Sequence, residues 1–225
     1  LPDSFIMYRP KDVVAGDFYW LEKRENKVLF AAADCTGHGV PGAMVSVVCN
    51  NGLNRSVREH DITEPGKILD RTREIVLDEF SKSAEKVNDG MDIALVSLEY
   101  KDDKIVLEYA GAHNPLWILP QGETEMTEIK ADKQPIGQFR SPTPYATHQV
   151  ELNRGDIIYI FTDGYADQFG GDKGKKMKTV NFKKLLLHNS QRSMIEQEAR
   201  LESTFDEWKG QLEQLDDVCV IGVRL

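Results

Sequence analysis

Two apolar segments near the N-terminus, joined by a short polar link, predict a β-hairpin. Apolar and aromatic residues dominate positions 13–22 and again 28–34, and the polar residues 24–27 lie between them. If Glu25 and Asn26 form a two-residue loop, Asp17 faces Asp34, although this turn is not the favoured Asn-Gly type and the register could slip by one or two residues. Facing Cβ atoms lie roughly 4.5–5.5 Å apart, so two carboxylates there would repel each other unless a cation compensates them.

Helical spacing of apolar residues predicts two consecutive pairs of helices. The first pair covers residues 41–58 and 63–80, with Thr63 as a cap and Pro65 in the first turn of the second helix. The second pair covers residues 180–190 and 193–212. The side chains expected on the buried faces are Met44, Val47, Val48, Leu53, Val57, Ile68, Leu69, Ile75, Val76, Phe80, Leu185, Leu186, Ile195, Leu201, Phe205 and Trp208.

The remaining apolar runs predict further strands. A second hairpin around residues 102–103 places Asp92 opposite His113, and for this pair we favour a structural hydrogen bond over a ligand role. The polar stretch 123–147 is expected to be an irregular connection, and the glycine- and lysine-rich stretch 170–179 a mobile loop. The predicted strands are residues 91–100, 104–112, 115–119, 147–152, 157–162 and 218–223.

Because the strands are grouped in hairpins and do not alternate with helices, the order of elements predicts mainly antiparallel sheets with helices packed outside them. This is an α+β layered sandwich. A chain of 225 residues with 40% hydrophobic residues can bury a sizeable core. There is no internal repeat and no evident linker, so residues 1–225 are interpreted as a single domain.

The composition narrows the classes of function. Three cysteines without CxxC spacing, Cys35, Cys49 and Cys219, argue against a disulfide framework or a thiolate zinc site and favour the cytoplasm. The net charge of −9 disfavours a nucleic-acid surface, and no apolar run is long enough to span a bilayer. The chain starts at Leu1 without a Met, so we expect a soluble domain excised from a longer protein, which could itself be membrane-tethered.

Acidic residues recur at the ends of predicted strands. Asp17 lies within the first strand and Asp34 ends the second; the later strand 157–162 is followed directly by Asp163, and Asp216 with Asp217 precedes the last one. Any one of them could simply cap a helix or a turn. As a set, they can meet at one edge of antiparallel sheets, where oxygen ligands without His or Cys select Mg²⁺ or Mn²⁺ over zinc.

These segments resemble a known family. Gly16-Asp17-Phe18-Tyr19-Trp20, Ala33-Asp34-Cys35-Thr36-Gly37-His38-Gly39, Phe161-Thr162-Asp163-Gly164 and Asp216-Asp217-Val218 occur in the order seen in metal-dependent serine/threonine protein phosphatases (PPM, or protein phosphatase 2C-like). The Asp-x-Thr-Gly-His-Gly segment is the most specific, and Ala110-Gly-Ala-His-Asn-Pro115 supports the bacterial SpoIIE/RsbU branch. The resemblance implies a four-layer α/β/β/α sandwich of two antiparallel sheets.

The resemblance also implies a site with two Mn²⁺ or Mg²⁺ ions and direct attack of a metal-bridging hydroxide on phosphoserine or phosphothreonine. Asp34 would bridge the metals, the Cys35 carbonyl would complete one site, and the remaining carboxylates would come from Asp17, Asp163 and Asp216, with Asp217 as the alternative to Asp216. The catalytic candidates are therefore Asp34, Asp17 and His38. The imidazole of His38 could protonate the leaving oxygen or merely hold its loop. No matching phosphate-binding arginine is found; Arg9 and Lys11 are only close in sequence.

Family analogy suggests that the substrate is a phosphorylated regulatory protein, such as an anti-sigma factor antagonist with a STAS fold. The activity would be controlled by an N-terminal sensor or dimerisation region of the same chain, acting through the helices near residues 41–80. A homodimer is one possible assembly. Two alternatives remain: a catalytically silent scaffold that binds phosphoproteins, and another two-metal phosphomonoesterase. A nucleic-acid partner is not expected.

Overall fold

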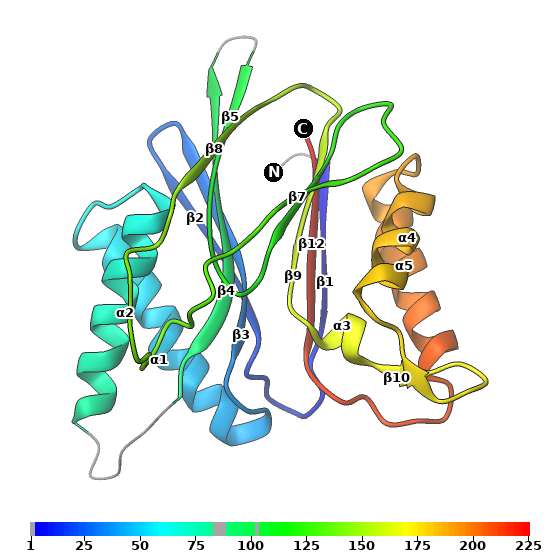
Figure 1. The fold of residues 1–225 in the computed structure, drawn as a ribbon, viewed down its shortest axis with the longest axis horizontal. Coiled ribbons are helices and arrows are strands. Elements are labelled where there is room, and N and C mark those ends of the chain that lie inside the picture. Colours follow the sequence, from blue (N-terminus) through cyan, green and yellow to red (C-terminus); the bar gives the residue numbers. More distant parts are fainter. Residues whose placement is uncertain (1–2, 83–88, 102–103) are drawn as a thin grey trace.

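The computed structural model describes residues 3–82, 89–101 and 104–225, in which two antiparallel sheets pack face to face between two pairs of helices (Figure 1). The first sheet has the order β2-β3-β4-β5-β8, formed by Phe18–Arg24, Lys27–Cys35, Met91–Lys101, Lys104–Ala112 and His148–Leu152. The second has the order β1-β12-β9-β6-β7, formed by Asp3–Arg9, Val218–Arg224, Ile157–Phe161, Leu116–Leu119 and Thr127–Ile129. The helices are α1 (Gly39–Arg58), α2 (Pro65–Ser81), α3 (Gly164–Asp167), α4 (Thr179–Asn189) and α5 (Met194–Lys209).

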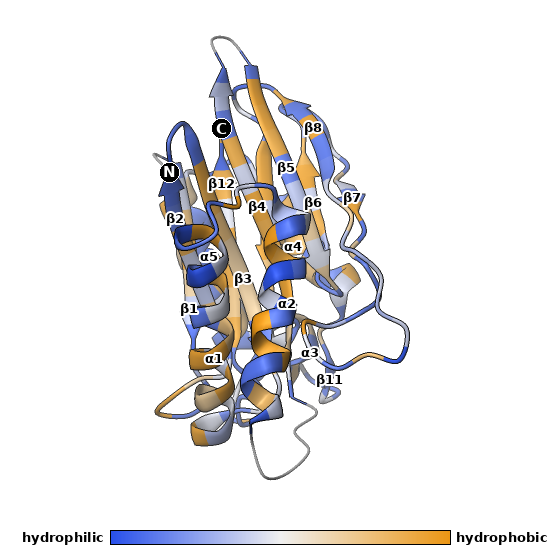
Figure 2. Cartoon of the chain, turned by 90° about the vertical axis from the view of Figure 1, so that its left-hand side faces the viewer, coloured by the Kyte–Doolittle hydropathy of each residue, from blue (hydrophilic) through white to orange (hydrophobic). Residues whose placement is uncertain are grey.

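Three apolar layers hold these elements together and confirm the α/β/β/α arrangement. In β3, Leu29 and Ala31 pack against α1 and α2, whereas the alternating residues Phe30 and Ala32 face the second sheet. Such alternation follows from the two-residue period of a strand. Figure 2 views the face covered by α1 and α2 and shows the strands behind them largely in hydrophobic colours. A third layer joins the second sheet to α4 and α5 through Trp117, Phe182 and Phe205, among others.

Both predicted hairpin registers are confirmed. Phe18 pairs with Ala33, which is the register that sets Asp17 beside Asp34. Ile93 pairs with Ala112, and in the next position the Nδ1 atom of His113 lies 2.9 Å from Oδ1 of Asp92. The loop length of each hairpin therefore agrees with the neighbours found across its two strands, Asp17 with Asp34 and Asp92 with His113. The tip of the second hairpin, residues 102–103, lies outside the described residues, as does most of the loop expected over 81–90.

Some local predictions were wrong. The pattern did not predict β1, the cap of α2 is Glu64 instead of Thr63, and Ile195 is 78% exposed. The helix α5 begins with a capping box of Ser193 and Glu196, and its buried face includes Met194 and Leu201. In α1, Met44 and Val47 also point to solvent.

The stretch expected to be a mobile loop instead contains two paired strands. These are β10 (Phe169–Gly170) and β11 (Lys175–Lys176). Among the described residues, no helix is long and apolar enough to cross a bilayer.

Candidate active site

The strand ends that carry the predicted acids surround one pocket at the edge of the sandwich. Its volume is about 330 Å³. The first sheet contributes Asp34 from β3 and Asp92 from β4, and the second contributes Asp163 after β9 and Asp216 before β12. The pocket is also lined by Cys35, Thr36, Gly37, His38, Asp89, Gly90, Met91, Pro135, Gly137 and Gln138. Residues far apart in the sequence thus meet as predicted, while Asp17 and Asp217 lie beneath the lining.

Asp17 and Asp34 form the deep part of the acidic site. Asp17 is 3% exposed, and its Oδ2 atom has no hydrogen-bond partner among the described residues. Burial raises the pKa of Asp17 to about 8, against the effect of a hydrogen bond from Thr162. Burial likewise raises the pKa of Asp34 to about 10, and the nearby charges of Asp17 and Asp163 raise it further. Both carboxyl groups therefore need a compensating positive charge to be ionised.

The glycines around Asp34 allow the backbone to come close to itself. Gly37 has φ 84°, a left-handed conformation that favours glycine, and a Cβ atom on Gly16 would lie 2.3 Å from the carbonyl oxygen of Gly37. The segment before β2 can therefore pack directly on the loop after β3. This packing brings Asp17 to the pocket and explains why both motifs contain glycine.

The adjacent residues Asp216 and Asp217 face different surroundings. Asp217 is 1% exposed and accepts backbone N–H groups: Oδ1 from Lys11 at 2.7 Å, and Oδ2 from Gly16 at 2.7 Å and from Asp17 at 3.3 Å. Its carboxylate therefore stabilises the segment between β1 and β2. Asp216 lines the pocket. The geometry thus favours Asp216 over Asp217 as the residue that can contact a bound ion.

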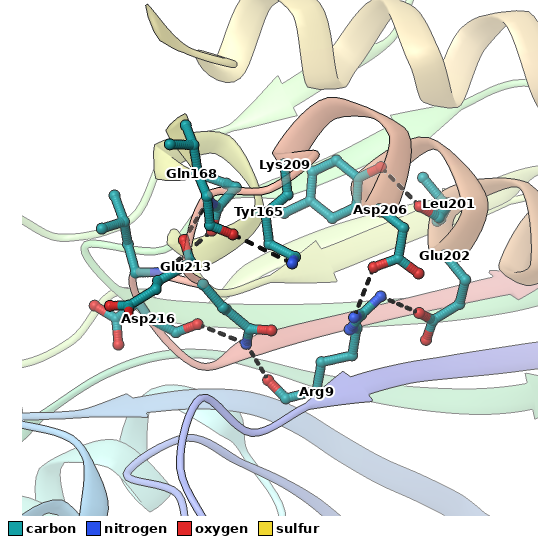
Figure 3. Close-up of polar contacts among 12 residues, drawn as sticks. Arg9, Tyr165, Gln168, Leu201, Glu202, Asp206, Lys209, Glu213 and Asp216 are labelled. Carbon is teal, nitrogen blue, oxygen red and sulfur yellow. Dashed lines mark hydrogen bonds and ion pairs between the residues drawn. The ribbon is translucent and has the colours of Figure 1, made fainter. Parts of the chain in front are cut away.

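The segment that carries Asp216 is held by the amide side chains of Gln168 and Gln214 (Figure 3). Gln168, fully buried after α3, donates from Nε2 to the Glu213 carbonyl and accepts from the Leu215 amide. Gln214 donates to the carbonyl oxygens of Asp216 and Arg9. These bonds fix the backbone just before β12. They also link it to the segment that follows Asp163 at the other side of the pocket.

The two basic candidates near the site have different environments. Arg9 lies over the ring of Phe205 and pairs with Glu202 at 2.9 Å and Asp206 at 2.8 Å, which directs it toward α5 (Figure 3). Lys11 places its Nζ atom 2.9 Å from Nε2 of His38.

His38, at the start of α1, uses both ring nitrogens. Nδ1 lies 2.8 Å from Oδ2 of Asp12, which assigns the proton to Nδ1 and leaves Nε2 to accept from Lys11. This arrangement supports the role of holding the loop. The neighbouring Cys35 thiol is buried, and its contact with Cys49 and its burial raise its pKa well above the usual value, which disfavours a thiolate nucleophile.

The pocket suits a hard cation only if ligands other than side chains take part. In the described part of the chain, no group of three or more His, Cys, Asp and Glu side chains is placed to hold a metal ion by itself. The unpartnered Oδ2 of Asp17 and the crowding of carboxyl groups nevertheless fit a positive ion. Such an ion would stabilise the ionised form of each carboxyl group. Mg²⁺ commonly keeps several water ligands and uses few carboxylates, so backbone carbonyl and water ligands are consistent with this geometry.

Sequence reasoning missed the importance of two pocket residues. Asp92 pairs with Asp34 across β3 and β4 and lines the pocket, although the sequence suggested only its bond to His113. Asp89 also lines the pocket, just before β4. The available signal was an Asp-Gly step directly before a buried strand, which mirrors the Asp163-Gly164 step directly after one.

The layered fold and its acidic edge define the class of PP2C-type phosphatase domains. The solved SiaA-PP2C domain of Pseudomonas aeruginosa superposes with a TM-score of 0.87 and 30% identity, covering 99% of this chain and 85% of that one. The chain belongs to the SpoIIE family, since residues 24–225 match the family described as Stage II sporulation protein E.

One sequence relative and one further solved structure extend the comparison. The phosphoserine phosphatase RsbU of Bacillus subtilis (strain 168) is 25% identical over 159 residues, which are 70% of this chain and 44% of RsbU, so the chain spans less than half the length of that relative. RsbX, solved in complex with magnesium, shares the fold with a TM-score of 0.64 at 12% identity, covering 97% of this chain and 92% of that one.

Proposed function

We propose that this domain hydrolyses phosphoserine or phosphothreonine on a regulatory protein, using two Mn²⁺ or Mg²⁺ ions. The observation that carries the proposal is the convergence of Asp34, Asp163 and Asp216 from both sheets on one pocket, with the buried, unpartnered Oδ2 of Asp17 beneath it. Family membership and the likeness to RsbU support a serine phosphatase. The magnesium complex of RsbX supports divalent cations in this fold.

Each acidic residue has a distinct part in the proposal. Asp34, Asp17, Asp163 and Asp216 would hold the ions together with the carbonyl group of Cys35. Bound divalent cations would neutralise the substrate phosphate and activate water for attack on phosphorus. Asp217 keeps the segment of Lys11 and Gly16 in place through its backbone hydrogen bonds.

His38 remains a candidate for the acid that protonates the leaving oxygen. To do so, its Nε2 atom must first bind a proton, so that both ring nitrogens carry one, and exchange the contact with Lys11 for one with substrate, while Asp12 continues to accept from Nδ1. The same exchange would free the Lys11 ammonium to approach an anion. Asp12 accepts from the imidazole in both roles, so a substitution of Asp12 tests whether the orientation of the His38 ring affects turnover.

Hydrolysis of p-nitrophenyl phosphate and of a phosphoserine peptide tests the proposal. We expect turnover with Mn²⁺, none with EDTA, and a loss in Asp34→Asn. Asp78→Asn, which changes a 67% exposed carboxylate on α2, serves as the matched control and should retain activity. Binding of a phosphoprotein without any turnover would instead indicate a silent scaffold, and turnover restricted to small phosphomonoesters would indicate another phosphomonoesterase.

The proposal extends to the organisation of the whole protein. We take residues 1–225 as one phosphatase domain, with a sensor or dimerisation region elsewhere in the same chain and a homodimer as one assembly to test. In one Mycobacterium tuberculosis protein of the same fold, a solved structure contains RsbU and RsbW domains together, so such a domain occurs beside another domain in the same protein. A cytoplasmic location follows from the proposed substrate.

A further inference from the structure

A lysine-rich surface lies beside the acidic pocket and has no part in the proposed chemistry. Six lysines and no acidic residue occur between positions 173 and 184, in a chain whose net charge is −9. We call the surface formed by Lys173, Lys175, Lys176 and Lys178 around β10 and β11 the lysine hairpin. Such a concentration of one charge sign, opposite to that of the whole chain, is a feature that can direct association with a partner.

The backbone of the lysine hairpin is held in place by hydrogen bonds and by packing on α5. Gly170 pairs with Lys175, and the Met177 and Lys178 amides donate to the carbonyls of Gln168 and Ala166 at 3.0 and 2.7 Å. The hairpin packs so closely on α5 that a Cβ atom on Gly170 would lie 1.9 Å from the carbonyl oxygen of Trp208. Its lysine side chains are therefore presented from an anchored backbone.

These side chains surround a hollow of about 380 Å³ with an aromatic floor. The lining includes Lys173, Lys175, Lys176 and Lys178, one acidic residue, Asp172, and also Asn181 and the half-buried Trp208. The Trp208 ring is fixed by a hydrogen bond from Nε1 to the carbonyl of Gln168. Lys176 pairs with Asp167, but over residues 3–82, 89–101 and 104–225 the other three ammonium groups have no carboxylate within salt-bridge distance. They are available to an acidic ligand.

The lysine hairpin is attached to both segments that bring the second sheet's acids to the pocket. Lys176 pairs at 2.6 Å with Asp167, whose amide donates to the carbonyl of Asp163. Gln168, beside β10, holds the Glu213 and Leu215 backbone that precedes Asp216. Figure 1 shows β10 next to α3, at the end of the sandwich where β9 ends and β12 begins. A protein whose phosphorylated residue enters the pocket would therefore pass close to these lysines.

We propose that the lysine hairpin binds an acidic segment of the protein substrate, close in space to its phosphorylated residue. The inference rests on the proposed phosphatase function and names the substrate class as a phosphoprotein with acidic flanks. The residues that line the pocket include no Lys or Arg, so the adjacent positive surface determines where such a segment can lie. The aromatic floor accommodates an apolar side chain between the acids.

Binding of a fluorescein-labelled peptide rich in Asp and Glu, without phosphate, tests this directly by fluorescence anisotropy. The variant K173E/K175E/K178E should bind about tenfold more weakly or worse at low salt, since three attractive contacts become repulsive. The control K23E/K104E/K130E alters net charge equally at distant positions and should bind like the parent. Equal weakening in both variants would overturn the proposal, because it would reflect overall charge alone.

A second set of measurements separates the two proposals. With phosphoserine peptides of acidic and neutral flanks, the hairpin variant should lose kcat/KM only for the acidic peptide, while p-nitrophenyl phosphate turnover stays unchanged. No turnover of p-nitrophenyl phosphate by the parent domain would overturn the phosphatase function and leave the anisotropy result to be judged alone.

The remaining outcomes also decide the question. A labelled single-stranded oligonucleotide that binds as tightly as the acidic peptide, and is lost in the same variant, would overturn the assignment of a protein ligand. If thermal melting shows that the charge-reversed variant is misfolded, K173Q/K175Q/K178Q replaces it and should show a smaller loss of peptide binding in the same direction. Unchanged binding in a folded glutamine variant would contradict the proposal.

Discussion

The two sheets contribute carboxyl groups of different character to the same pocket. From the first sheet, Asp17 is buried and Asp34 partly buried, with pKa values raised to about 8 and about 10. From the second sheet, Asp163 lies at the rim, where partial burial and the charge of Asp167 raise its pKa only to about 6. The deep pair is thus neutral near pH 7, whereas the rim residue is mostly ionised.

This difference separates two tasks that a single acidic cluster would otherwise combine. The rim carboxylate of Asp163 can attract a cation from water, because it is mostly ionised near pH 7. A bound cation stabilises the ionised form of the deep pair most strongly, because ionisation of these buried carboxyl groups has the largest desolvation cost. We therefore expect substitutions in the deep pair to affect chemistry most, and substitutions at the rim to affect mainly the affinity for ions.

The largest expected effect is that of Asp34→Asn. Loss of the carboxylate at the centre of the site should lower kcat for p-nitrophenyl phosphate about a thousandfold, a loss of several kcal/mol of transition-state stabilisation. The metal-free melting temperature should not fall, since a neutral amide replaces a carboxyl group that is itself neutral at this pH. The variant Asp163→Asn should lose less kcat than Asp34→Asn, because a rim substitution is expected to affect mainly the affinity for ions. Equal losses of kcat in both variants would contradict the difference between the deep pair and the rim.

The second effect is a pH-dependent stabilisation by Mn²⁺. Asp17 and Asp34 keep their protons to about pH 8 and 10 in the fold, but in the unfolded chain both carboxyl groups have the ordinary pKa of 3.8. The metal-free fold therefore binds more protons than the unfolded chain, and its free energy of unfolding falls as the pH rises through this window. A cation must displace those protons, so its affinity should rise about tenfold per pH unit for each proton displaced.

Thermal melting with and without Mn²⁺ checks this prediction. From about pH 6 to about pH 8, each displaced proton gives about a hundredfold gain in affinity, which adds about 2.7 kcal/mol of stabilisation at saturating metal. The increase in melting temperature caused by Mn²⁺ should thus be larger at the higher pH. Asp17→Asn, which removes one titrating carboxyl group, should reduce this pH dependence; an identical shift at both pH values in the parent domain would refute the raised pKa values.

Much of the fold and part of the site could be predicted because they depend on local pattern. The two hairpin registers follow from loop length and the period of a strand, and they place Asp17 beside Asp34 and Asp92 beside His113. The apolar run that ends at Asp163 is likewise visible without tertiary information. Glycine-rich corners after buried strands thus carried the strongest functional signal.

The rest depends on contacts between distant segments. β1 is a short strand whose pairing with β12 joins the two ends of the described chain, and nothing local specifies it. The different roles of Asp216 and Asp217 arise because Asp217 meets the amides of Lys11 and Gly16, about two hundred residues away in sequence. Sequence pattern could identify the acidic pair but could not assign the roles within it.

The third prediction compares substitutions of Asp216 and Asp217, each of which serves as the control for the other. Asp217→Ala leaves the buried amides of Gly16 and Asp17 without their acceptor, which should lower the free energy of unfolding by about 2–3 kcal/mol. Asp216→Ala should leave metal-free stability nearly unchanged and weaken Mn²⁺ binding. Urea denaturation and calorimetric titration measure the two quantities. Similar stability in both variants would show that the hydrogen bonds of Asp217 contribute little.

The smallest expected effect concerns the hydrogen bond between His113 and Asp92. Asp92 is the residue that pairs with Asp34 in the first sheet. His113→Ala should lower stability by about 1 kcal/mol, because it removes one partly exposed hydrogen bond to a carboxylate. His113 also has φ 58°, a conformation that Asn tolerates better than Ala. His113→Asn should therefore recover part of the lost stability, measured by urea denaturation. If Mn²⁺ affinity falls tenfold in both variants although Asn restores stability, the imidazole itself orients Asp92 toward the ions, and the deep site of the first sheet then extends to a third carboxylate.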